Sequence, residues 1–171
     1  PVTDNVYTPL AYSNDRLDGK LPNVFLIDEA GALPSTYAIE AMRSGQLTIR
    51  NKLGCVISTK YPREENPFEE EVAYAKRVLD GTEKDETLFA LLFEPDSPKG
   101  WETDTAILKQ ANPLSLTVPE VYDDLLKKRR RAITMRSARE NFLCKHCNIL
   151  YQGSATETYV AIDDLRRGRV D

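Results

Sequence analysis

The stretch Asn23 to Gly31, which reads N-V-F-L-I-D-E-A-G, constrains the fold of this chain more than any other. Its residues 24–27 are apolar without a polar break, the pattern of a parallel strand buried on both faces. Two carboxylates, Asp28 and Glu29, follow at the carboxyl end, where open α/β sheets bind their ligands. The sequence therefore predicts an α/β fold with an acidic site at one edge of its sheet.

Two further apolar runs, residues 53–59 and 87–93, are typical of buried strands in the same sheet. Helices are predicted between the three runs. Pro34 can open one that ends near Ser44, and Asn66-Pro67 with Glu69 favours another that ends near Asp80. Such connections are long enough for right-handed crossovers, so we expect a parallel sheet. Because three strands make a thin sheet, we interpret it as part of a larger one.

Beyond Ser97 the pattern changes to short helices, predicted at 103–111, 117–131 and 137–150. Thr117-x-x-Glu120 and Ser137-x-x-Glu140 match the capping-box pattern at the start of the last two. We expect these helices to form a small subdomain beside the sheet. The predicted domains are residues 1–96 for the sheet and its helices, 97–152 for the helical subdomain, and 153–171 for the start of a linker. In the last helix, the residues predicted to face inward are Phe142, Leu143, His146, Ile149 and Leu150.

Composition excludes several classes of protein. The 171 residues are 41% hydrophobic and 29% charged, with a net charge of −4, so no overall basic character points to nucleic acid. No segment approaches the roughly 18 consecutive apolar residues of a membrane span, and we expect no membrane partner. Three cysteines, an odd number, argue against a disulfide framework and favour a reducing compartment.

The pair Asp28 and Glu29 matches the Walker B arrangement of nucleotide hydrolases. There the last acid of the strand holds Mg²⁺ through water, and a following Glu can polarise the attacking water. Two alternatives remain open at this point. The acids can form an ordinary solvated turn, or they can be half of a metal-dependent nuclease site, although nothing nearby marks the further acids that such a site needs.

Ser58 and Thr59 end the second predicted strand, so we expect them beside Asp28 at the carboxyl edge of the sheet. A hydroxyl at that place can hydrogen-bond a phosphate, or the water that replaces it. The simpler alternative is that the Ser-Thr pair only terminates the strand.

Cys144-Lys145-His146-Cys147 has some of the character of a zinc motif. The chain offers no other His and only Cys55 besides, so four ligands are not readily assembled. Cys144 and Cys147 lie one turn apart on a helix, and we interpret them as core and boundary residues.

Five consecutive basic residues lie in the predicted helix 117–131. They can be a solvated helix end whose cations favour the helix dipole. Alternatively they contact DNA phosphates, or offer an arginine to the nucleotide of a neighbouring subunit. These candidates are Lys127, Lys128, Arg129, Arg130 and Arg131.

Taken in order, several blocks resemble the large terminase subunit of tailed bacteriophages, in particular the branch with HK97-like capsids. The blocks span roughly residues 10–150, and their order and spacing are more specific than the Walker B segment alone. They are S-N-D-R-L-D-G (13–19), V-F-L-I-D-E-A-G-A-L (24–33), V-I-S-T (56–59), L-L-F-E-P-D (91–96), W-E-T-D-T-A-I-L-K-Q-A-N-P (101–113) and R-E-N-F-L-C-K-H-C-N (139–148).

The resemblance implies a partial P-loop NTPase of the ASCE type, belonging to an ATP-driven motor that pumps viral DNA into a procapsid. It implies ATP and Mg²⁺ as ligands, with Asp28 on the metal and Glu29 on the hydrolytic water. Ser58 and Thr59 would couple loss of the γ-phosphate to motion of the helical subdomain. The implied partners are double-stranded DNA, the portal protein, the small terminase subunit and further copies in a ring on the procapsid, in the host cytoplasm.

The chain departs from the family pattern in several places. It contains no G-x-x-x-x-G-K-[ST] phosphate loop, which lies upstream in the family, and no nuclease acids, which lie downstream. Lys60-Tyr61 stands where a small residue is expected after Ser58-Thr59, and Asn148-Ile149-Leu150 replaces the usual Asn-x-Trp. We therefore interpret the chain as the distal half of the ATPase domain, and expect it neither to bind ATP tightly nor to hydrolyse it alone.

Two other functions remain open. Half of a helicase-like motor would carry further motor motifs after residue 93, and residues 97–171 show none. A catalytically silent scaffold or regulatory module derived from such a motor is equally compatible with the missing phosphate loop.

Overall fold

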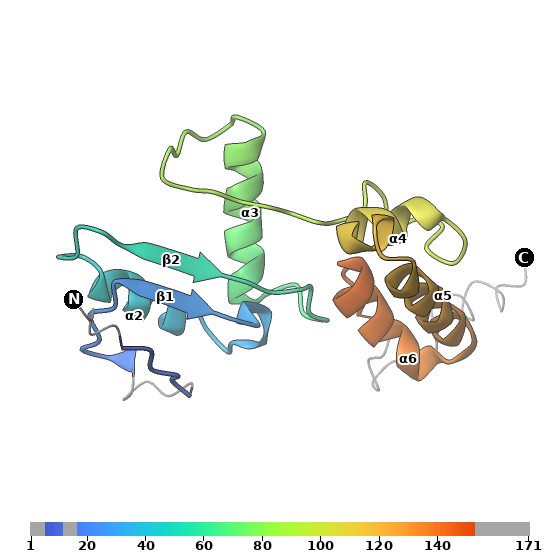
Figure 1. Cartoon of the computed structure of the whole chain (residues 1–171), viewed down its shortest axis with the longest axis horizontal. Coiled ribbons are helices and arrows are strands. Elements are labelled where there is room, and N and C mark those ends of the chain that lie inside the picture. Colours follow the sequence, from blue (N-terminus) through green and yellow to red (C-terminus); the bar gives the residue numbers. More distant parts are fainter. Residues whose placement is uncertain (1–5, 12–16, 153–171) are drawn as a thin grey trace, which may run out of the picture. The chain divides into compact units, whose positions relative to one another are not determined.

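The computed structural model describes residues 6–11 and 17–152, and the predicted linker 153–171 lies outside them (Figure 1). The described residues form two units. The sheet unit contains residues 6–11, 17–59 and 64–91, and the helical unit contains residues 60–63 and 92–152. Among the described residues, no helix is both long and apolar enough to cross a membrane.

The sheet unit is built on two parallel strands, as the crossover argument predicts. β1 (Val24–Ile27) pairs with β2 (Leu53–Val56), with Val24 opposite Leu53 and Ile27 opposite Val56. Gly54 lies against the ring of Phe25, where a Cβ would stand only 2.4 Å from Cζ, so any larger residue here would have to displace that ring. The connection between the strands contains the 3₁₀ turn η1 (Ala30–Ala32) and α2 (Tyr37–Gly45).

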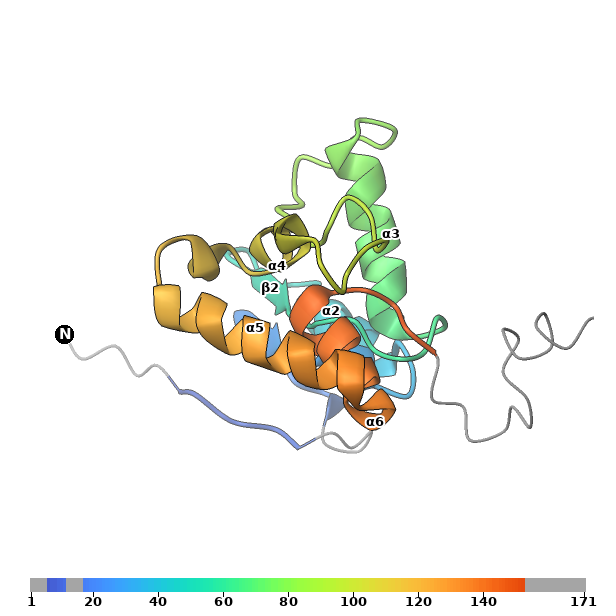
Figure 2. The same cartoon turned by 90° about the vertical axis from the view of Figure 1, so that its right-hand side faces the viewer.

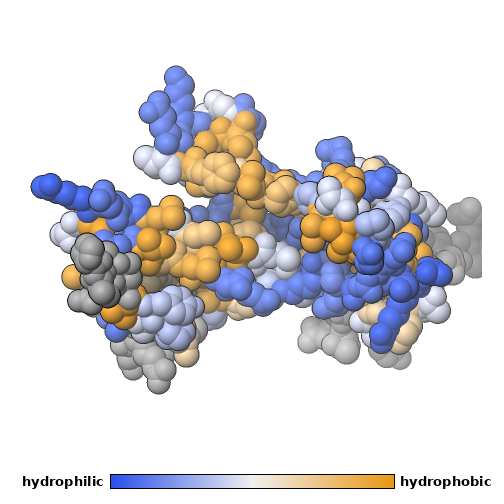
Figure 3. Space-filling model, in the orientation of Figure 1, coloured by the Kyte–Doolittle hydropathy of each residue, from blue (hydrophilic) through white to orange (hydrophobic). Residues whose placement is uncertain are grey.

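The two faces of this sheet differ. Phe25, Ile27 and Val56 pack with Ala38 and Met42 of α2 to form the core. No described helix packs on the other face, and Figure 3 shows apolar side chains gathered over the strands. The prediction of strands buried on both faces is therefore wrong for the described residues, because only one face has a helix packed on it. The exposed fractions on the open face are 62% for Val24, 61% for Leu26, 61% for Leu53 and 49% for Ile57.

α3 (Pro67–Leu79) begins as its sequence predicts. The side chain of Asn66 accepts hydrogen bonds from the N–H groups of Phe68 and Glu69, and Pro67 takes the first helical position. A capped start with acids in the first turn fixes this helix locally, which explains why its prediction from sequence is accurate to about a residue.

The predicted strand at residues 87–93 is wrong. The segment has no regular structure, and Phe89 and Leu91 are 82% and 64% exposed. A strand needs a neighbour for its backbone N–H and C=O groups. In the part of the chain that the structure describes, the sheet consists of β1 and β2 alone, so an apolar β-type pattern here has no ladder to join.

The helical unit contains α4 (Thr105–Ala111), the 3₁₀ turn η2 (Pro113–Leu116), α5 (Pro119–Thr134), α6 (Arg136–Asn141) and the π-helical turn η3 (Phe142–His146). Figure 2 shows α5 as the longest of these helices, with α6 beside it. Their shared core consists of Ile107, Leu108, Leu125, Ala132, Phe142, Leu143, Cys147 and Ile149. The inward positions predicted for Phe142, Leu143 and Ile149 are thus confirmed, whereas His146 and Leu150 are only half-buried.

Both predicted capping boxes in this unit are wrong. Val118 occupies the N-cap position of α5 without a side-chain bond, while the Thr117 hydroxyl donates to the carbonyl of Leu114 in the preceding turn. α6 begins before Ser137, directly after the extended residue Met135. Thr117 is thus used by the preceding turn, and Ser137 already lies within α6.

Candidate functional site at the carboxyl edge of the sheet

The two acids lie in the turn directly after β1, and both are exposed. The Asp28 Oδ1 atom accepts a hydrogen bond from the N–H of Glu29 at 2.8 Å. Glu29 has φ 54° and ψ 41°, the left-handed region that non-glycine residues rarely occupy. Such backbone strain gathers at functional sites, where the surroundings hold it in place. The turn thus presents two carboxylates from a backbone that its neighbours constrain.

Ser58 is one of those neighbours. The N–H of Gly31 donates to the Ser58 Oγ at 3.0 Å, and the Ser58 hydroxyl in turn donates to the carbonyl of Thr59. The backbone continues the pairing, since Ala30 N–H donates to the carbonyl of Ile57 at 3.1 Å. The structure therefore brings the Ser58-Thr59 segment beside the turn that carries Asp28 and Glu29, as parallel strand pairing predicts.

The residues at this edge fit a magnesium ion that keeps most of its water. Among the described residues, no three His, Cys, Asp or Glu side chains gather closely enough to hold a metal ion by themselves. Mg²⁺ is commonly held by one or two carboxylates together with water and substrate phosphates. Asp28, an exposed carboxylate at the end of β1, provides one ligand of that kind.

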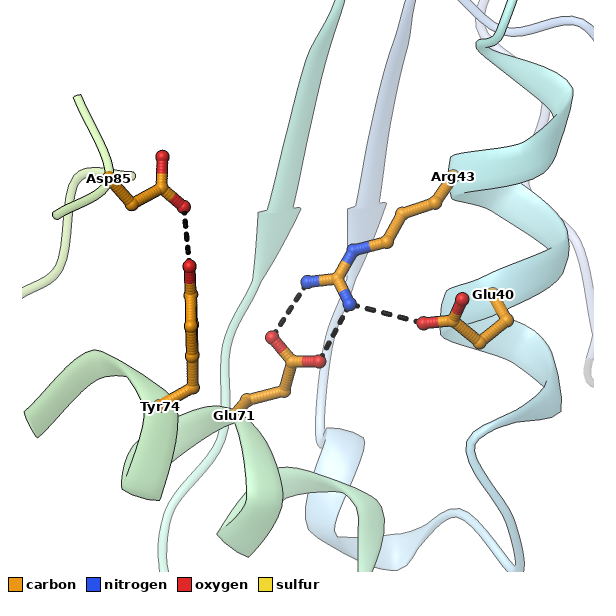
Figure 4. Close-up of polar contacts among 5 residues, drawn as sticks. All are labelled: Glu40, Arg43, Glu71, Tyr74 and Asp85. Carbon is orange, nitrogen blue, oxygen red and sulfur yellow. Dashed lines mark hydrogen bonds and ion pairs between the residues drawn. The ribbon is translucent and has the colours of Figure 1, made fainter. Parts of the chain in front are cut away.

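On the packed side of the sheet, α2 and α3 are tied by a bidentate ion pair that sequence reasoning missed. The Arg43 guanidinium contacts both carboxylate oxygens of Glu71, at 2.8 and 2.7 Å, and also reaches Glu40 at 3.2 Å (Figure 4). Hydrogen bonding to Glu71 raises the pKa of Arg43. Nothing in the local sequence marks this pair, because its members are 28 positions apart.

The same pair lines a groove of about 510 Å³, together with Phe25 and Gly54 of the sheet. Tyr74 donates to Asp85 at 2.9 Å on another side of this groove (Figure 4). Hydrogen bonds from Thr87, and then from Tyr74, hold the pKa of Asp85 below its usual range. These polar groups are paired with one another, so we interpret the groove as a structural feature of the sheet unit.

The basic run of α5 divides into different environments. Arg129 is 8% exposed, and its guanidinium donates to the carbonyl of Asp104 at 2.9 Å, ahead of α4. Lys128 pairs with Asp124 at 3.2 Å on the helix surface. Lys127, Arg130 and Arg131 are exposed. Arg129 is therefore a structural residue of the helical unit rather than an available phosphate contact.

Cys144 and Cys147 are buried in the helical unit, at 1% and 0% exposure, so both are core residues and neither lies at a boundary as the sequence interpretation proposed. Burial raises the pKa of Cys147 to about 12. Burial, together with the charge of Lys128, lowers the pKa of His146.

Residues 1–77 match the family model described as the terminase large subunit, ATPase domain. The resemblance to terminase large subunits is thereby confirmed. The matched segment contains Asp28, Glu29, Ser58 and Thr59, so the whole candidate site lies inside the terminase match. Searches among the curated proteins and among the solved structures gave no significant match.

The match indicates a component of a DNA-packaging motor, and a terminase ATPase domain implies ATP hydrolysis by the full-length protein. The described residues combine helices with a two-stranded parallel sheet, as is expected of part of a P-loop-like terminase fold.

Proposed function

We propose that this chain is the distal part of the motor ATPase of a phage terminase of the HK97-like branch, which couples ATP hydrolysis to DNA translocation into a procapsid. The hydrogen bond from Gly31 to Ser58 carries this proposal. It joins the turn after the two acids to the end of the neighbouring strand. Coupling loss of a phosphate to motion of the helical subdomain requires a connection of this kind.

In this proposal each residue at the edge has one role. Asp28 holds Mg²⁺ through water, and the ion, when bound, neutralises charge on the transferred phosphate. Glu29 accepts a proton from the attacking water or orients it, from an exposed carboxylate on a constrained backbone. The Ser58 hydroxyl, which donates to the Thr59 carbonyl, can donate instead to a phosphate while its oxygen still accepts from the Gly31 amide, and Thr59 supplies the adjacent hydroxyl.

The open face of the sheet supports the proposed division of the chain. Val24, Leu26 and Leu53 form an exposed apolar surface that a finished α/β sheet would cover. Residues 1–96, apart from residues 60–63 and 92–96, which group with the helical unit, then form part of an ATPase core whose other strands and phosphate loop lie elsewhere in the full-length protein. Residues 97–152 form its helical subdomain, and residues 153–171 begin the linker to a nuclease domain.

The exposed cations Lys127, Arg130 and Arg131 are our candidates for contact with double-stranded DNA, or with the nucleotide of the next subunit in a ring. The other partners proposed are the portal protein and the small terminase subunit, in the cytoplasm of the bacterial host. Reversing the charge of Arg130 in the full-length protein should lower DNA translocation or ATP hydrolysis. Unchanged values in both assays would assign the run to a solvated helix surface.

The proposed roles of the acids are tested by Glu29→Gln and Asp28→Asn in the full-length terminase, with the exposed Glu86→Gln as the control. Glu29→Gln should lower kcat for ATP hydrolysis by about 100-fold or more while nucleotide still binds. Asp28→Asn should weaken magnesium-dependent nucleotide binding. Normal turnover by Glu29→Gln would overturn the assignment. Isothermal titration of Mg-ATP into the present chain should show no tight binding, since the chain contains no phosphate loop.

A further inference from the structure

The chain passes into the helical unit immediately after Thr59. Residues 60–63 group with the helical unit, residues 64–91 return to the sheet unit, and the chain enters the helical unit again at residue 92. The first of these passages begins one residue beyond the hydroxyls of Ser58 and Thr59. Whatever holds residues 60–63 within the helical unit is therefore covalently next to the candidate site.

The side chain of Asn148 hydrogen-bonds the chain at both passages, the segments that begin at residues 60 and 92. The Asn148 Oδ1 atom accepts a hydrogen bond from the N–H of Lys60 at 3.3 Å, and its Nδ2 atom donates to the carbonyl of Phe93 at 2.7 Å. Asn148 itself has φ 50°, a left-handed backbone directly after η3 and Cys147. Asparagine suits this place because it tolerates the left-handed region and carries a donor and an acceptor in one amide.

A second contact reinforces the first passage. The Lys145 ammonium lies 3.4 Å from the centre of the Tyr61 ring, and its Nζ atom is buried. A cation over an aromatic face is attracted by the ring, and more strongly once water is excluded. Lys60-Tyr61 stands where the terminase resemblance predicts a small residue. In this chain Tyr61 instead supplies the surface on which Lys145 rests.

We propose that Asn148, with Lys145 and Tyr61, forms a latch through which a change at Ser58-Thr59 moves the helical unit. The inference rests on the proposed function. The latch residues are positioning residues: they touch neither nucleotide nor the attacking water, but a shift of the backbone at Thr59 pulls directly on Lys60 and hence on the Asn148 amide. Because the same amide binds Phe93, the two passages move together.

The test uses full-length terminase and three variants. Asn148→Gly keeps a residue that accepts the left-handed backbone and removes the amide. Asn148→Asp keeps the acceptor for Lys60 and loses the donor to Phe93. Asn141→Asp, an exposed change at the end of α6, is the control for added charge. For each we would measure basal ATP hydrolysis, DNA translocated per ATP, and hydrogen exchange of the segment 58–63.

Asn148→Gly should leave basal hydrolysis within about two-fold and lower the DNA moved per ATP at least tenfold, with Asn148→Asp between it and the wild type. Exchange at Lys60 should rise at least tenfold in Asn148→Gly and stay unchanged in the control. Tyr61→Phe, which keeps the ring, should retain coupling that Tyr61→Leu loses.

The latch is overturned if hydrogen exchange at Lys60 is unchanged in Asn148→Gly. It is also overturned if hydrolysis and translocation fall by the same factor as the amount of folded protein. A full-length wild-type protein without ATPase activity would instead overturn the proposed function, and the exchange measurement would still decide whether Asn148 holds the passage.

Discussion

The backbone N–H of Gly31 donates a hydrogen bond to the hydroxyl of Ser58, 3.0 Å away. This bond crosses from the turn after β1 to the end of β2, two segments that are 27 positions apart in the sequence. Through this bond, a movement of the turn that presents Asp28 and Glu29 is transmitted to Ser58.

Replacing Ser58 by Ala should lower the free energy of unfolding by about 1 kcal/mol, because a half-buried amide loses its acceptor. Urea denaturation of the chain at low micromolar concentration measures this loss. Ser44→Ala, an exposed change on α2, is the matched control and should shift stability by less than about 0.5 kcal/mol. Equal effects of the two changes would contradict the role given to the Gly31–Ser58 bond.

Replacing Glu29 by Gly should stabilise the fold while it abolishes hydrolysis in the full-length protein. At φ 54° a side chain costs about 1 kcal/mol, which glycine does not incur. The gain is reduced by the greater freedom of glycine in the unfolded chain. Glu86→Gly, at a residue outside the left-handed region, should destabilise instead by about 0.5 kcal/mol. If both variants lose stability, the turn at Glu29 is not strained.

Arg129 and Arg130 are neighbours with opposite surroundings, and their variants should differ accordingly. Arg129→Met should destabilise the helical unit by about 2 kcal/mol, because the carbonyl of Asp104 loses a charged donor. Arg130→Met, on the exposed side of α5, should change stability by less than about 0.5 kcal/mol. Thermal or urea unfolding followed by circular dichroism would compare them, and similar losses would refute the structural role of Arg129.

The stability of the helical unit should fall as the solution becomes mildly acidic. Burial, with the charge of Lys128, holds the pKa of His146 in the folded chain below its ordinary 6.5, while Asp124 opposes this shift. The fold thus favours the neutral ring. Its contribution is complete above pH 6.5 and is lost as the pH falls through the lower folded pKa. Urea midpoints between pH 7.5 and 5 measure the slope, which should be shallower in His146→Gln; an identical slope would exclude His146 as its source.

Local chemistry explains which elements could be predicted from the sequence. Asn66, Pro67 and Glu69 act within one turn, and α3 begins where they indicate. The strand from Val24 to Ile27 was also predictable, since four apolar residues before two acids leave few other structures. In the candidate site, the meeting of Ser58 with the acidic turn follows from parallel pairing alone.

What could not be predicted depends on partners distant in the sequence. Residues 87–93 have a strand pattern, but a strand exists only beside another one. The Arg43–Glu71 ion pair and the Asn148 contacts each join residues far apart along the chain, and no local pattern marks them. The burial of Arg129 within a run of cations likewise follows from the packing of α5 near Asp104, not from composition.

The open face of the β-sheet has a consequence for the handling of this polypeptide by itself. Val24, Leu26 and Leu53 present apolar surface to water, and each strand of the described sheet has one unpaired edge. Surfaces and edges of this kind favour association with a second copy of the chain. The separate polypeptide should therefore sediment with a mass that grows with concentration. A lysine in place of Leu53 should keep it monodisperse without disturbing the core packed beneath α2.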